Sequence, residues 1–187
     1  MLKGLCKNLL KWAGWTAEIT VPMRDKCIIC VAPHTSNWDF ILGELYYGSQ
    51  GRKAEFLMKK EWFFWPLGPI FRKMGGIPVA RSKKTSLTSQ LIEAANKAEY
   101  FNLAVTPEGT RKLNPKWKRG FYHIANGARI PIHLYAIDGD NKRIVCTKEI
   151  MPSGDIDADI RIIIEYYRPY IGHEIRKGQF AIEEYEA

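Results

Sequence analysis

The sequence predicts an α/β fold in which helices flank a mostly parallel sheet, with an amphipathic helix at the N-terminus. Short apolar runs typical of buried strands alternate with segments of helical spacing as far as residue 137, a pattern typical of parallel sheets. The last strand-like segments follow each other closely, so we expect antiparallel pairing at one edge. The 187 residues have the length of one domain, and a single domain over 1–187 is expected.

Composition and periodicity predict the individual elements. Apolar and β-branched runs predict strands at 27–32, 55–58, 77–79, 103–105, 130–137, 143–148 and 160–167. Helical spacing predicts helices at 36–47, 84–100 and 119–128, and a weaker helical pattern covers 173–186. Ser36 and Asp39 resemble a capping box at the start of the first of these helices.

Residues 1–17 contain the amphipathic helix, which the spacing places at 2–17. Apolar side chains fall on one side and lysines on the other: Leu2, Leu5, Cys6, Leu9, Leu10, Trp12, Ala13 and Thr16 against Lys3, Lys7 and Lys11. This pattern is typical of a helix that lies in a membrane interface. A helix that packs on the core of its own domain gives the same pattern, so both interpretations stay open.

The aromatic residues are concentrated in one stretch, 61–73, which prolines interrupt. Its side chains either line a groove for an apolar chain or touch lipid. Packing in the core or against a second copy of the chain is the alternative.

The charge of the chain predicts an anionic partner. Lys and Arg number 28 against 20 Asp and Glu, which gives a net charge of +8. Such a charge attracts nucleic acid, anionic lipid headgroups or phosphorylated substrates. The basic residues form neither a zinc finger nor an aromatic RNA-binding strand, so we expect an anionic membrane surface rather than nucleic acid.

The cysteines indicate a reducing compartment. Cys27 and Cys30 are three apart on a predicted strand and therefore point to opposite faces, which suits neither a metal site nor a disulfide. We expect buried free thiols, as in proteins of reducing compartments. No apolar run approaches the length of a membrane span, and lysines interrupt every apolar segment near the N-terminus. The predicted location is the cytoplasm, at the inner face of a membrane.

The first polar motif runs from His34 to Asp39, directly after the predicted strand 27–32. Open α/β sheets carry their sites in loops at strand ends. If His34 precedes the helix and Asp39 lies in its first turn, the imidazole can fold back onto the carboxylate. Such a pair makes a general base, because the carboxylate fixes the tautomer and stabilises the imidazolium. Alternatively, Asp39 only caps its helix and His34 is a structural residue.

The second polar motif, 106–111, also follows a predicted buried strand. Gly109 lets backbone N–H groups approach a ligand closely, and Arg111 offers a planar fork suited to phosphate. Further basic residues nearby strengthen the positive field: Lys112, Lys116, Lys118 and Arg119. An ordinary polar turn with solvated basic side chains is the alternative.

Together the two motifs resemble the lysophospholipid acyltransferase family, which includes the 1-acylglycerol-3-phosphate acyltransferases. Two further segments agree with the family: Lys59-x-Glu61 followed by Pro66, Gly68 and 75–81, and Lys118-x-Gly120 followed by Ala125 and 130–132. The matches run in order over 28–137. Pro33 stands where the family usually has Asn, and Thr106 stands where it usually has Phe.

The resemblance implies an O-acyltransferase with His34 as general base and Asp39 as its orienting partner. It assigns substrate binding to Lys59, Arg81, Glu108, Gly109, Thr110 and Arg111, and places Pro131 in the region that shapes the acyl-donor site. Acyl-CoA or acyl carrier protein would supply the acyl group and a lysophospholipid would accept it. No cofactor is expected, and no metal, because His123, His133 and His173 lack ligand spacing.

Two other functions fit the same residues. A lipid-binding module without catalysis accounts for the charge and the aromatic side chains. A hydrolase of thioesters or lipids would use the same His–Asp pair on water, and only the hydroxyl in the site distinguishes it from a transferase.

Overall fold

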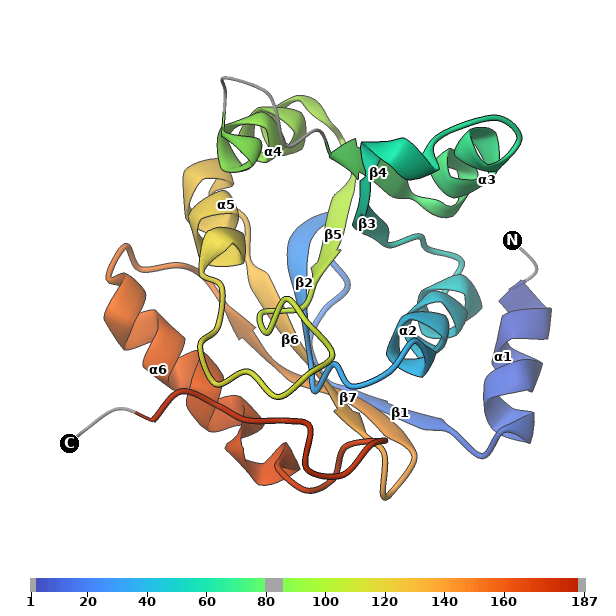
Figure 1. The fold of residues 1–187 in the computed structure, drawn as a ribbon, viewed down its shortest axis with the longest axis vertical. Coiled ribbons are helices and arrows are strands. Elements are labelled where there is room, and N and C mark those ends of the chain that lie inside the picture. Colours follow the sequence, from blue (N-terminus) through green and yellow to red (C-terminus); the bar gives the residue numbers. More distant parts are fainter. Residues whose placement is uncertain (1–2, 80–85, 185–187) are drawn as a thin grey trace.

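A parallel sheet forms the centre of the computed structural model, which describes residues 3–79 and 86–184. Its strands are β1 (Thr16–Ile19), β2 (Lys26–Ala32), β3 (Glu55–Lys59), β4 (Gly76–Val79), β5 (Phe101–Val105), β6 (Ile132–Asp138) and β7 (Arg143–Ile150). Within the described residues they form one seven-stranded sheet in the order β1-β7-β6-β2-β5-β3-β4 (Figure 1). Only β6 and β7 pair antiparallel. The predicted fold class is confirmed.

Helices cover both faces of the sheet (Figure 1). They are α1 (Lys3–Trp12), α2 (Trp38–Ser49), α3 (Leu67–Met74), α4 (Leu87–Lys97), α5 (Gly120–Ala128) and α6 (Ile156–Tyr167), with short 3₁₀ turns η1 (Lys60–Trp62) and η2 (Arg168–Tyr170). The helices α4, α5 and α6 bury their apolar residues in a core on one face. The helices α1 and α2 form a second core on the other face.

The central strand β2 divides its side chains between these two cores. Ile28 and Cys30 point into the first core, whereas Cys27 and Ile29 point into the second, as alternation along a strand requires. Cys27 and Cys30 therefore lie on opposite faces, and all four cysteines are buried and free. The expectation of buried free thiols is confirmed.

The segment predicted as a strand at 160–167 is helical, so that prediction is wrong. The run of isoleucines favours a strand by composition, but the helix α6 begins earlier, at a side-chain cap: Asp155 accepts the N–H of Ala158 at 3.1 Å. From there Ile160, Ile163, Ile164 and Tyr167 recur at helical spacing and are buried, while Ile162 points outward. Helical periodicity overrides the β-branched composition.

Other segments also differ from the prediction. The first helix ends at Trp12 rather than 17, because Gly14 adopts a positive φ of 78° and the chain continues into β1 beside β7. The proline-broken stretch 61–73 contains the start of α3. No helix forms within the described residues 173–184, and 185–186 lie outside them.

The strands β5 and β3 pair over only a short length and then diverge. They pair only at Glu55 with Leu103 and at Phe56 with Ala104. Beyond these pairs β3 continues beside β4, while β5 continues beside β2. The gap between the diverging ends lies next to the loops that follow β2 and β5, which carry the two polar motifs.

The cap at α6 gives a stability prediction. We expect Asp155→Ala to lower the free energy of unfolding by about 1 kcal/mol, because the N–H of Ala158 loses its acceptor. Urea unfolding followed by circular dichroism measures the change. Asp155→Ser, which retains a capping oxygen, is the control and should stay close to wild type. An equal loss in both variants would contradict the assigned role of the cap.

Candidate active site

The site lies where β2 and β5 end side by side. Because these strands are parallel neighbours, their carboxyl ends meet at the same edge of the sheet. His34 follows β2 and the segment 106–111 follows β5. The fold thus brings together two motifs that are more than seventy residues apart.

His34 and Asp39 form the pair that the sequence predicts. His34 Nδ1 lies 3.2 Å from Asp39 Oδ2, and the imidazole remains 20% exposed while the carboxyl group is 2% exposed. Since a carboxylate only accepts hydrogen bonds, this contact favours the tautomer of a neutral imidazole that has its proton on Nδ1 and its lone pair on Nε2. Asp39 thus orients the ring of His34.

The backbone of the same loop holds Asp39 in place. Its Oδ2 also accepts the N–H groups of Thr35 and Ser36 at 2.8 and 2.9 Å. Asp39 lies in the first turn of α2, where the helix dipole favours a negative charge. Only one half of the predicted capping box between Ser36 and Asp39 forms: Asp39 Oδ2 accepts the Ser36 N–H, whereas Ser36 Oγ accepts the N–H of Trp38 and the N-cap position is occupied by Asn37.

The side chain of Glu108 joins the loop that follows β5 to the loop that follows β2. Its side chain is 0% exposed, and its Oε1 accepts the backbone N–H of His34 at 2.7 Å. Burial raises its pKa to about 8, although the hydrogen bond from His34 opposes this shift. Glu108 does not line the cleft beside His34, so the substrate contact expected from the resemblance does not fit its position. Its geometry is that of a support for the His34 backbone.

Directly after Glu108 the chain turns at Gly109, which has a positive φ of 64°. A Cβ at this position would meet the far end of the flexible Lys118 side chain at 2.7 Å, which can move aside, so it is the backbone conformation that favours glycine. Arg111 Nη1 donates to Asn37 Oδ1 at 2.5 Å and thereby links this loop to the start of α2. Gly109, Arg111 and Lys118 all line the cleft.

Other residues named from the sequence lie elsewhere. Thr110 accepts the N–H of Lys112 and does not line the cleft, and Lys59 is the last residue of β3. Arg81 lies outside the described residues. Pro131 precedes β6, and its carbonyl accepts the N–H of Ile28. It therefore lies at the amino end of that strand, opposite the site, and its expected place beside an acyl donor is not supported.

Sequence reasoning did not identify Asn37 as part of the site. Its position inside the first motif was the available signal, but only the fold shows which side chain it meets. Lys118 was noted for its charge, and its contact with Gly109 depends on a backbone hydrogen bond from Lys118 N–H to Pro107 O at 2.7 Å.

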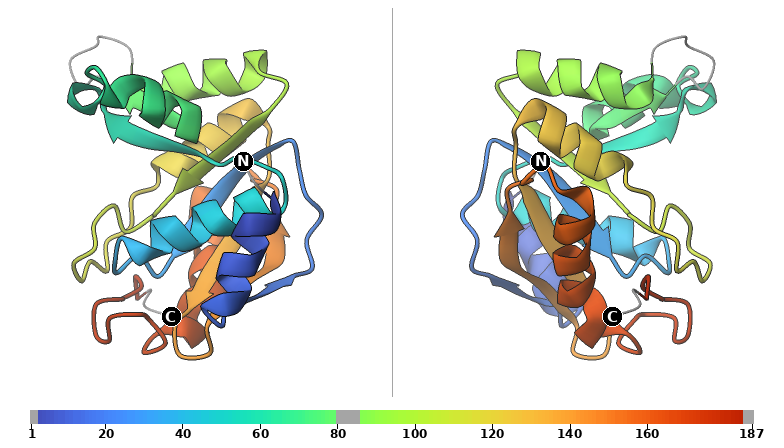
Figure 2. Two further views of the ribbon diagram at one scale, coloured as in Figure 1. Left: turned by 90° about the vertical axis from the view of Figure 1, so that its right-hand side faces the viewer. Right: turned by 90° about the vertical axis from the view of Figure 1, so that its left-hand side faces the viewer.

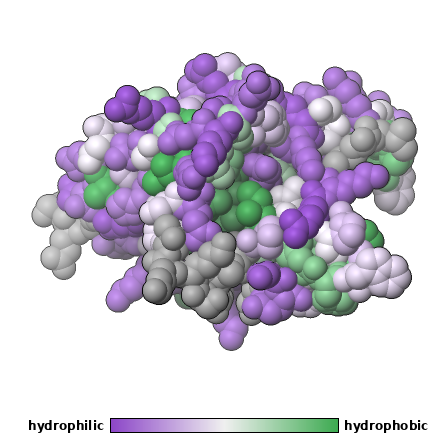
Figure 3. Space-filling model, turned by 90° about the horizontal axis from the view of Figure 1, so that it is seen from above, coloured by the Kyte–Doolittle hydropathy of each residue, from purple (hydrophilic) through white to green (hydrophobic). Residues whose placement is uncertain are grey.

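A cleft of about 990 Å³ extends from the His34–Asp39 pair into the molecule. The helix α2 contributes Phe40, Gly43 and Tyr47, and β3 contributes Leu57 and Met58. In the view from above, the surface is hollowed and hydrophobic residues are exposed within a largely hydrophilic rim (Figure 3). The cleft has the size and the mainly apolar lining of a site for a ligand with a long apolar part.

The aromatic stretch 61–73 does not line this cleft. Four of its large side chains are exposed, namely Trp62, Phe64, Trp65 and Ile70, at between 51% and 85%, whereas Phe63, Leu67 and Phe71 are partly buried. Of the uses considered for this stretch, a groove lining and a packed core are therefore wrong for these four residues.

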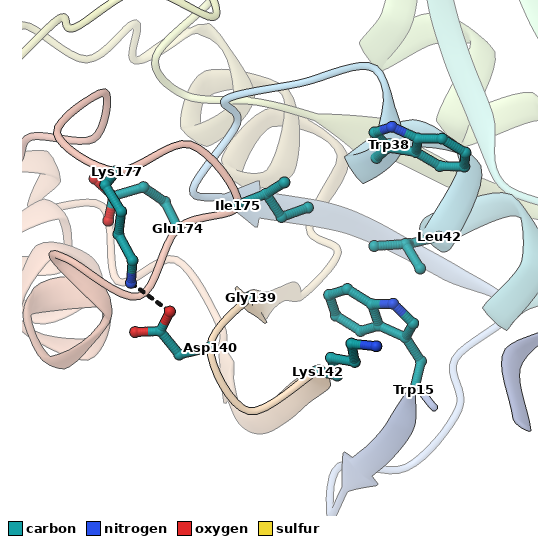
Figure 4. Close-up of a pocket in the computed structure, with 9 residues that line it drawn as sticks. All are labelled: Trp15, Trp38, Leu42, Gly139, Asp140, Lys142, Glu174, Ile175 and Lys177. Carbon is teal, nitrogen blue, oxygen red and sulfur yellow. Dashed lines mark hydrogen bonds and ion pairs between the residues drawn. The ribbon is translucent and has the colours of Figure 1, made fainter. Parts of the chain in front are cut away.

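A smaller hollow of about 320 Å³ lies against the opposite face of α2 (Figure 4). Trp38 and Leu42 of α2 face Trp15 and Ile175 across it, and Lys177 is paired with Asp140 at its rim. Its lining includes neither His34 nor Asp39. We therefore place the chemistry in the larger cleft.

The described residues contain neither a metal-binding cluster nor a membrane-spanning helix. No group of three or more His, Cys, Asp or Glu side chains in the part of the chain that the structure describes is placed to hold a metal ion. Among the helices of residues 3–79 and 86–184, none combines the length and apolar character needed to span a membrane.

Comparison with known proteins identifies the class. Residues 17–137 match the acyltransferase family, and this range contains both polar motifs. Since the match covers more than half of the chain, the protein belongs to the acyltransferase family. It is an acyltransferase enzyme with an α/β fold.

A solved structure shares the fold. The crystal structure of the 1-acyl-sn-glycerophosphate (LPA) acyltransferase PlsC from Thermotoga maritima superposes with a TM-score of 0.59 at 17% sequence identity. The similarity covers 89% of this chain and 78% of that chain. No curated protein matches the sequence.

The position of Glu108 predicts different results for two substitutions. Glu108→Gln should keep most of the activity, because an amide oxygen still accepts the His34 N–H. Glu108→Ala should lose roughly tenfold or more, because it leaves that buried N–H without an acceptor, at a cost of about 1–3 kcal/mol. Steady-state kinetics measure both. Equal losses would instead indicate that substrate needs the carboxylate.

The raised pKa of Glu108 also predicts a pH effect on stability. The folded protein retains a proton up to about pH 8 that the unfolded chain releases near pH 4.3, so this group contributes stability at low pH that is lost as pH rises through 8. Glu108→Gln should therefore gain stability relative to wild type, by about 1–3 kcal/mol between pH 5 and pH 8. Urea unfolding at several pH values measures the difference. A difference that stays constant with pH would refute the assignment.

Proposed function

We propose that this protein transfers a fatty acyl group from acyl-CoA or acyl carrier protein to a hydroxyl group of a lysophospholipid or related glycerolipid. The observation that carries the proposal is the His34–Asp39 pair, 3.2 Å apart, at the mouth of a deep and mainly apolar cleft. The relative from Thermotoga maritima is named for such a reaction on 1-acyl-sn-glycerophosphate.

His34 acts as the general base of this reaction. An alcohol is a poor nucleophile at neutral pH, so Nε2 takes its proton as the oxygen attacks the thioester carbonyl. Asp39 stabilises the imidazolium that results. The thiol that leaves has a pKa of about 8.5, like a cysteine, and departs without strong acid assistance. One base therefore suffices, and Ser36 is 2% exposed with its Oγ accepting the Trp38 N–H, which suits a structural role.

The acceptor's phosphate binds beside Arg111 and Lys118. Both cations line the cleft on the side of the loop that follows β5, and Asn37 holds the guanidinium toward the start of α2. A planar guanidinium matches two phosphate oxygens, and Lys118 adds a second positive charge. In this proposal a glycerol hydroxyl of the same acceptor reaches His34, which lines the same cleft as the two cations.

The acyl chain of the donor occupies the apolar part of the cleft. Its walls come from α2, from the diverging strands β3 and β5, from β6 and from the helices α4 and α5. Burial of methylene groups there stabilises the bound donor by about 0.8 kcal/mol for each group that leaves water.

The protein reaches its acceptor at an anionic membrane surface on the cytoplasmic side. Cys6 and Leu10 of α1 are buried against α2, whereas Leu5, Leu9 and Trp12 form an exposed stripe, with Trp12 87% exposed. The two interpretations of the amphipathic helix are thus compatible, since one side packs and the adjacent side is open. The lysines of α1 are also exposed, on the other side of the helix from this stripe, and they add to the positive charge that attracts anionic lipid.

The exposed aromatic residues of 61–73 belong to the same surface. The helices α1, α2 and α3 face the same side of the molecule (Figure 2, left). Trp62, Phe64 and Trp65 lie just before α3, and Trp and Tyr are favoured at membrane–water boundaries. We define the membrane-facing surface as Leu5, Leu9, Trp12, Trp62, Phe64 and Trp65.

The catalytic proposal predicts that acyl transfer depends on both His34 and an acceptor. Wild-type protein mixed with a long-chain acyl-CoA should release free thiol only when lysophosphatidate is present. His34→Ala should lower this rate by about a thousandfold or more, because the base is lost. A thiol reagent follows the release, and mass spectrometry identifies the acylated product. An acyl carrier protein thioester replaces acyl-CoA in a parallel assay.

His123→Ala is the control for this assay, since His123 is exposed on α5 and does not line the cleft. Thiol release without acceptor would identify a hydrolase. No release from either donor, together with retained binding of lipid, would identify a binding module.

The membrane proposal predicts a position-dependent effect of apolar side chains. Leu9→Ser should weaken binding to anionic vesicles by about tenfold, because the leucine loses its burial in the interface. Ile162→Ser is the matched control: Ile162 is 42% exposed and Leu9 is 41% exposed, but Ile162 lies on α6. Vesicle cosedimentation measures both, and added salt should weaken binding of the wild type. Equal binding by the two variants would show that α1 does not contact the membrane interface.

A further inference from the structure

The C-terminal segment 171–184 lies beside the loop that joins β5 to α5 (Figure 1). Phe180 and Ile182 anchor this segment, since both are buried in the core that α4, α5 and α6 form. Glu174 is also buried, and its Oε1 accepts the N–H of Gly178 at 2.7 Å, which holds the turn that leads to Phe180. The segment is therefore fixed to the body of the protein by its own residues.

Trp117 carries the contact between the loop and this segment. Its side chain is buried and packs against the rings of Tyr167 and Phe180, whose centroids lie 5.6 and 6.1 Å from its own. The indole Nε1–H donates to Ala181 O at 3.1 Å. The backbone N–H of Trp117 donates to Glu183 Oε1 at 2.6 Å. One residue of the loop is thus held by aromatic packing and by two hydrogen bonds to the C-terminal segment.

The second oxygen of Glu183 binds Arg119, two residues further along the loop. Glu183 Oε2 accepts a hydrogen bond from Arg119 Nη2 at 3.3 Å, while Nη1 of the same guanidinium donates to Asp157 Oδ1 at 2.6 Å. Arg119 is also the N-cap residue of α5. The carboxylate of Glu183 therefore holds Trp117 and Arg119 at once, and Lys118 is the residue between them.

Lys118 contacts the cleft side of the loop. Its backbone N–H donates to Pro107 O at 2.7 Å, and its side chain lies against Gly109. The side chain is exposed and lines the cleft. Because an exposed lysine side chain is flexible, the backbone sets the region that its ammonium group can reach. The two contacts of Glu183 fix that backbone on either side of Lys118.

We propose that Glu183 is a positioning residue for the acceptor, because it holds the loop where Lys118 meets the acceptor's phosphate. This inference rests on the proposed function, in which Arg111 and Lys118 bind that phosphate. Glu183 does not line the cleft and lies outside the part of the chain that matches the family, so it acts through the loop alone. Its loss should weaken binding of the acceptor and leave binding of the acyl donor and the rate of the bound complex unchanged.

Steady-state kinetics with lysophosphatidate and a long-chain acyl-CoA test this role. Glu183→Ala should raise the KM for lysophosphatidate by about tenfold, because the N–H of Trp117 loses its acceptor and the loop loses its position. The kcat and the KM for acyl-CoA should stay within about twofold of wild type. Glu183→Gln should raise the KM for lysophosphatidate by a smaller factor, because its amide oxygen still accepts the N–H of Trp117. Thermal unfolding confirms that each variant is folded.

Glu184→Ala is the matched control. Glu184 is the next residue along the chain, but it pairs with Arg168 at 3.3 Å instead of binding the loop. This exposed pair contributes little, so the control should leave the KM for lysophosphatidate within about twofold of wild type. A double variant then shows whether the effect passes through Lys118. Adding Glu183→Ala to Lys118→Ala should raise the KM no more than about twofold further.

Limited digestion with trypsin tests the loop without any acyl transfer. Trypsin cuts after lysine and arginine, and the exposed Arg111 and Lys112 lie in the loop. Glu183→Ala should be cut there faster than wild type or Glu184→Ala, because exposed loops that lose their anchors are cut more readily. Mass spectrometry locates the cuts.

The outcomes separate the inference from the proposed function. A KM for lysophosphatidate that rises less than about threefold in a folded Glu183→Ala, or an effect that is fully additive with that of Lys118→Ala, overturns the inference. Unchanged cleavage of the loop in Glu183→Ala overturns it as well. A wild-type protein that transfers no acyl group to lysophosphatidate overturns the proposed function itself.

Discussion

The site depends on the buried carboxylate of Asp39. One of its oxygens accepts two backbone N–H groups and faces the imidazole of His34, so a single atom organises the whole turn between β2 and α2. A buried carboxylate is unfavourable unless it is hydrogen-bonded, and these contacts together with the helix N-terminus offset that cost. The same contacts that stabilise the turn therefore orient the imidazole of His34.

A second carboxyl group supports the first from the neighbouring strand. Glu108 is fully buried and holds the backbone N–H of His34, so the loop after β5 fixes the position of the loop after β2. Its pKa of about 8 favours the protonated form at neutral pH. Asp39 lies close enough that its negative charge helps to raise the pKa of Glu108. A neutral Glu108 therefore adds no second full negative charge beside Asp39. The two carboxyl groups thus have separate functions.

The sequence predicted what depends on local pattern and missed what depends on packing. It predicted the strands β2 to β7. It did not predict β1, which follows a glycine turn and is recognised only by its pairing with β7. It took α6 for a strand because isoleucines dominate the segment, although Asp155 marks a helix start. The His34–Asp39 pair was predictable because six consecutive residues contain it. The burial of Glu108 and the contact of Arg111 with Asn37 were not, since both require β2 and β5 to be neighbours.

In the proposed function, the helix α2 connects the catalytic pair to lipid on both sides. Its first turn holds Asp39, one face lines the cleft, and another face packs against α1, whose exposed stripe carries Leu9 and Trp12. A substrate with a charged head and an apolar tail has its reactive atoms between these two environments. An enzyme acting on it needs a base at the boundary of water and apolar surface, with the tail leading away from it. The first turn of α2 meets these two environments, because the cleft that it lines also has Arg111 and Lys118 and many apolar side chains in its walls.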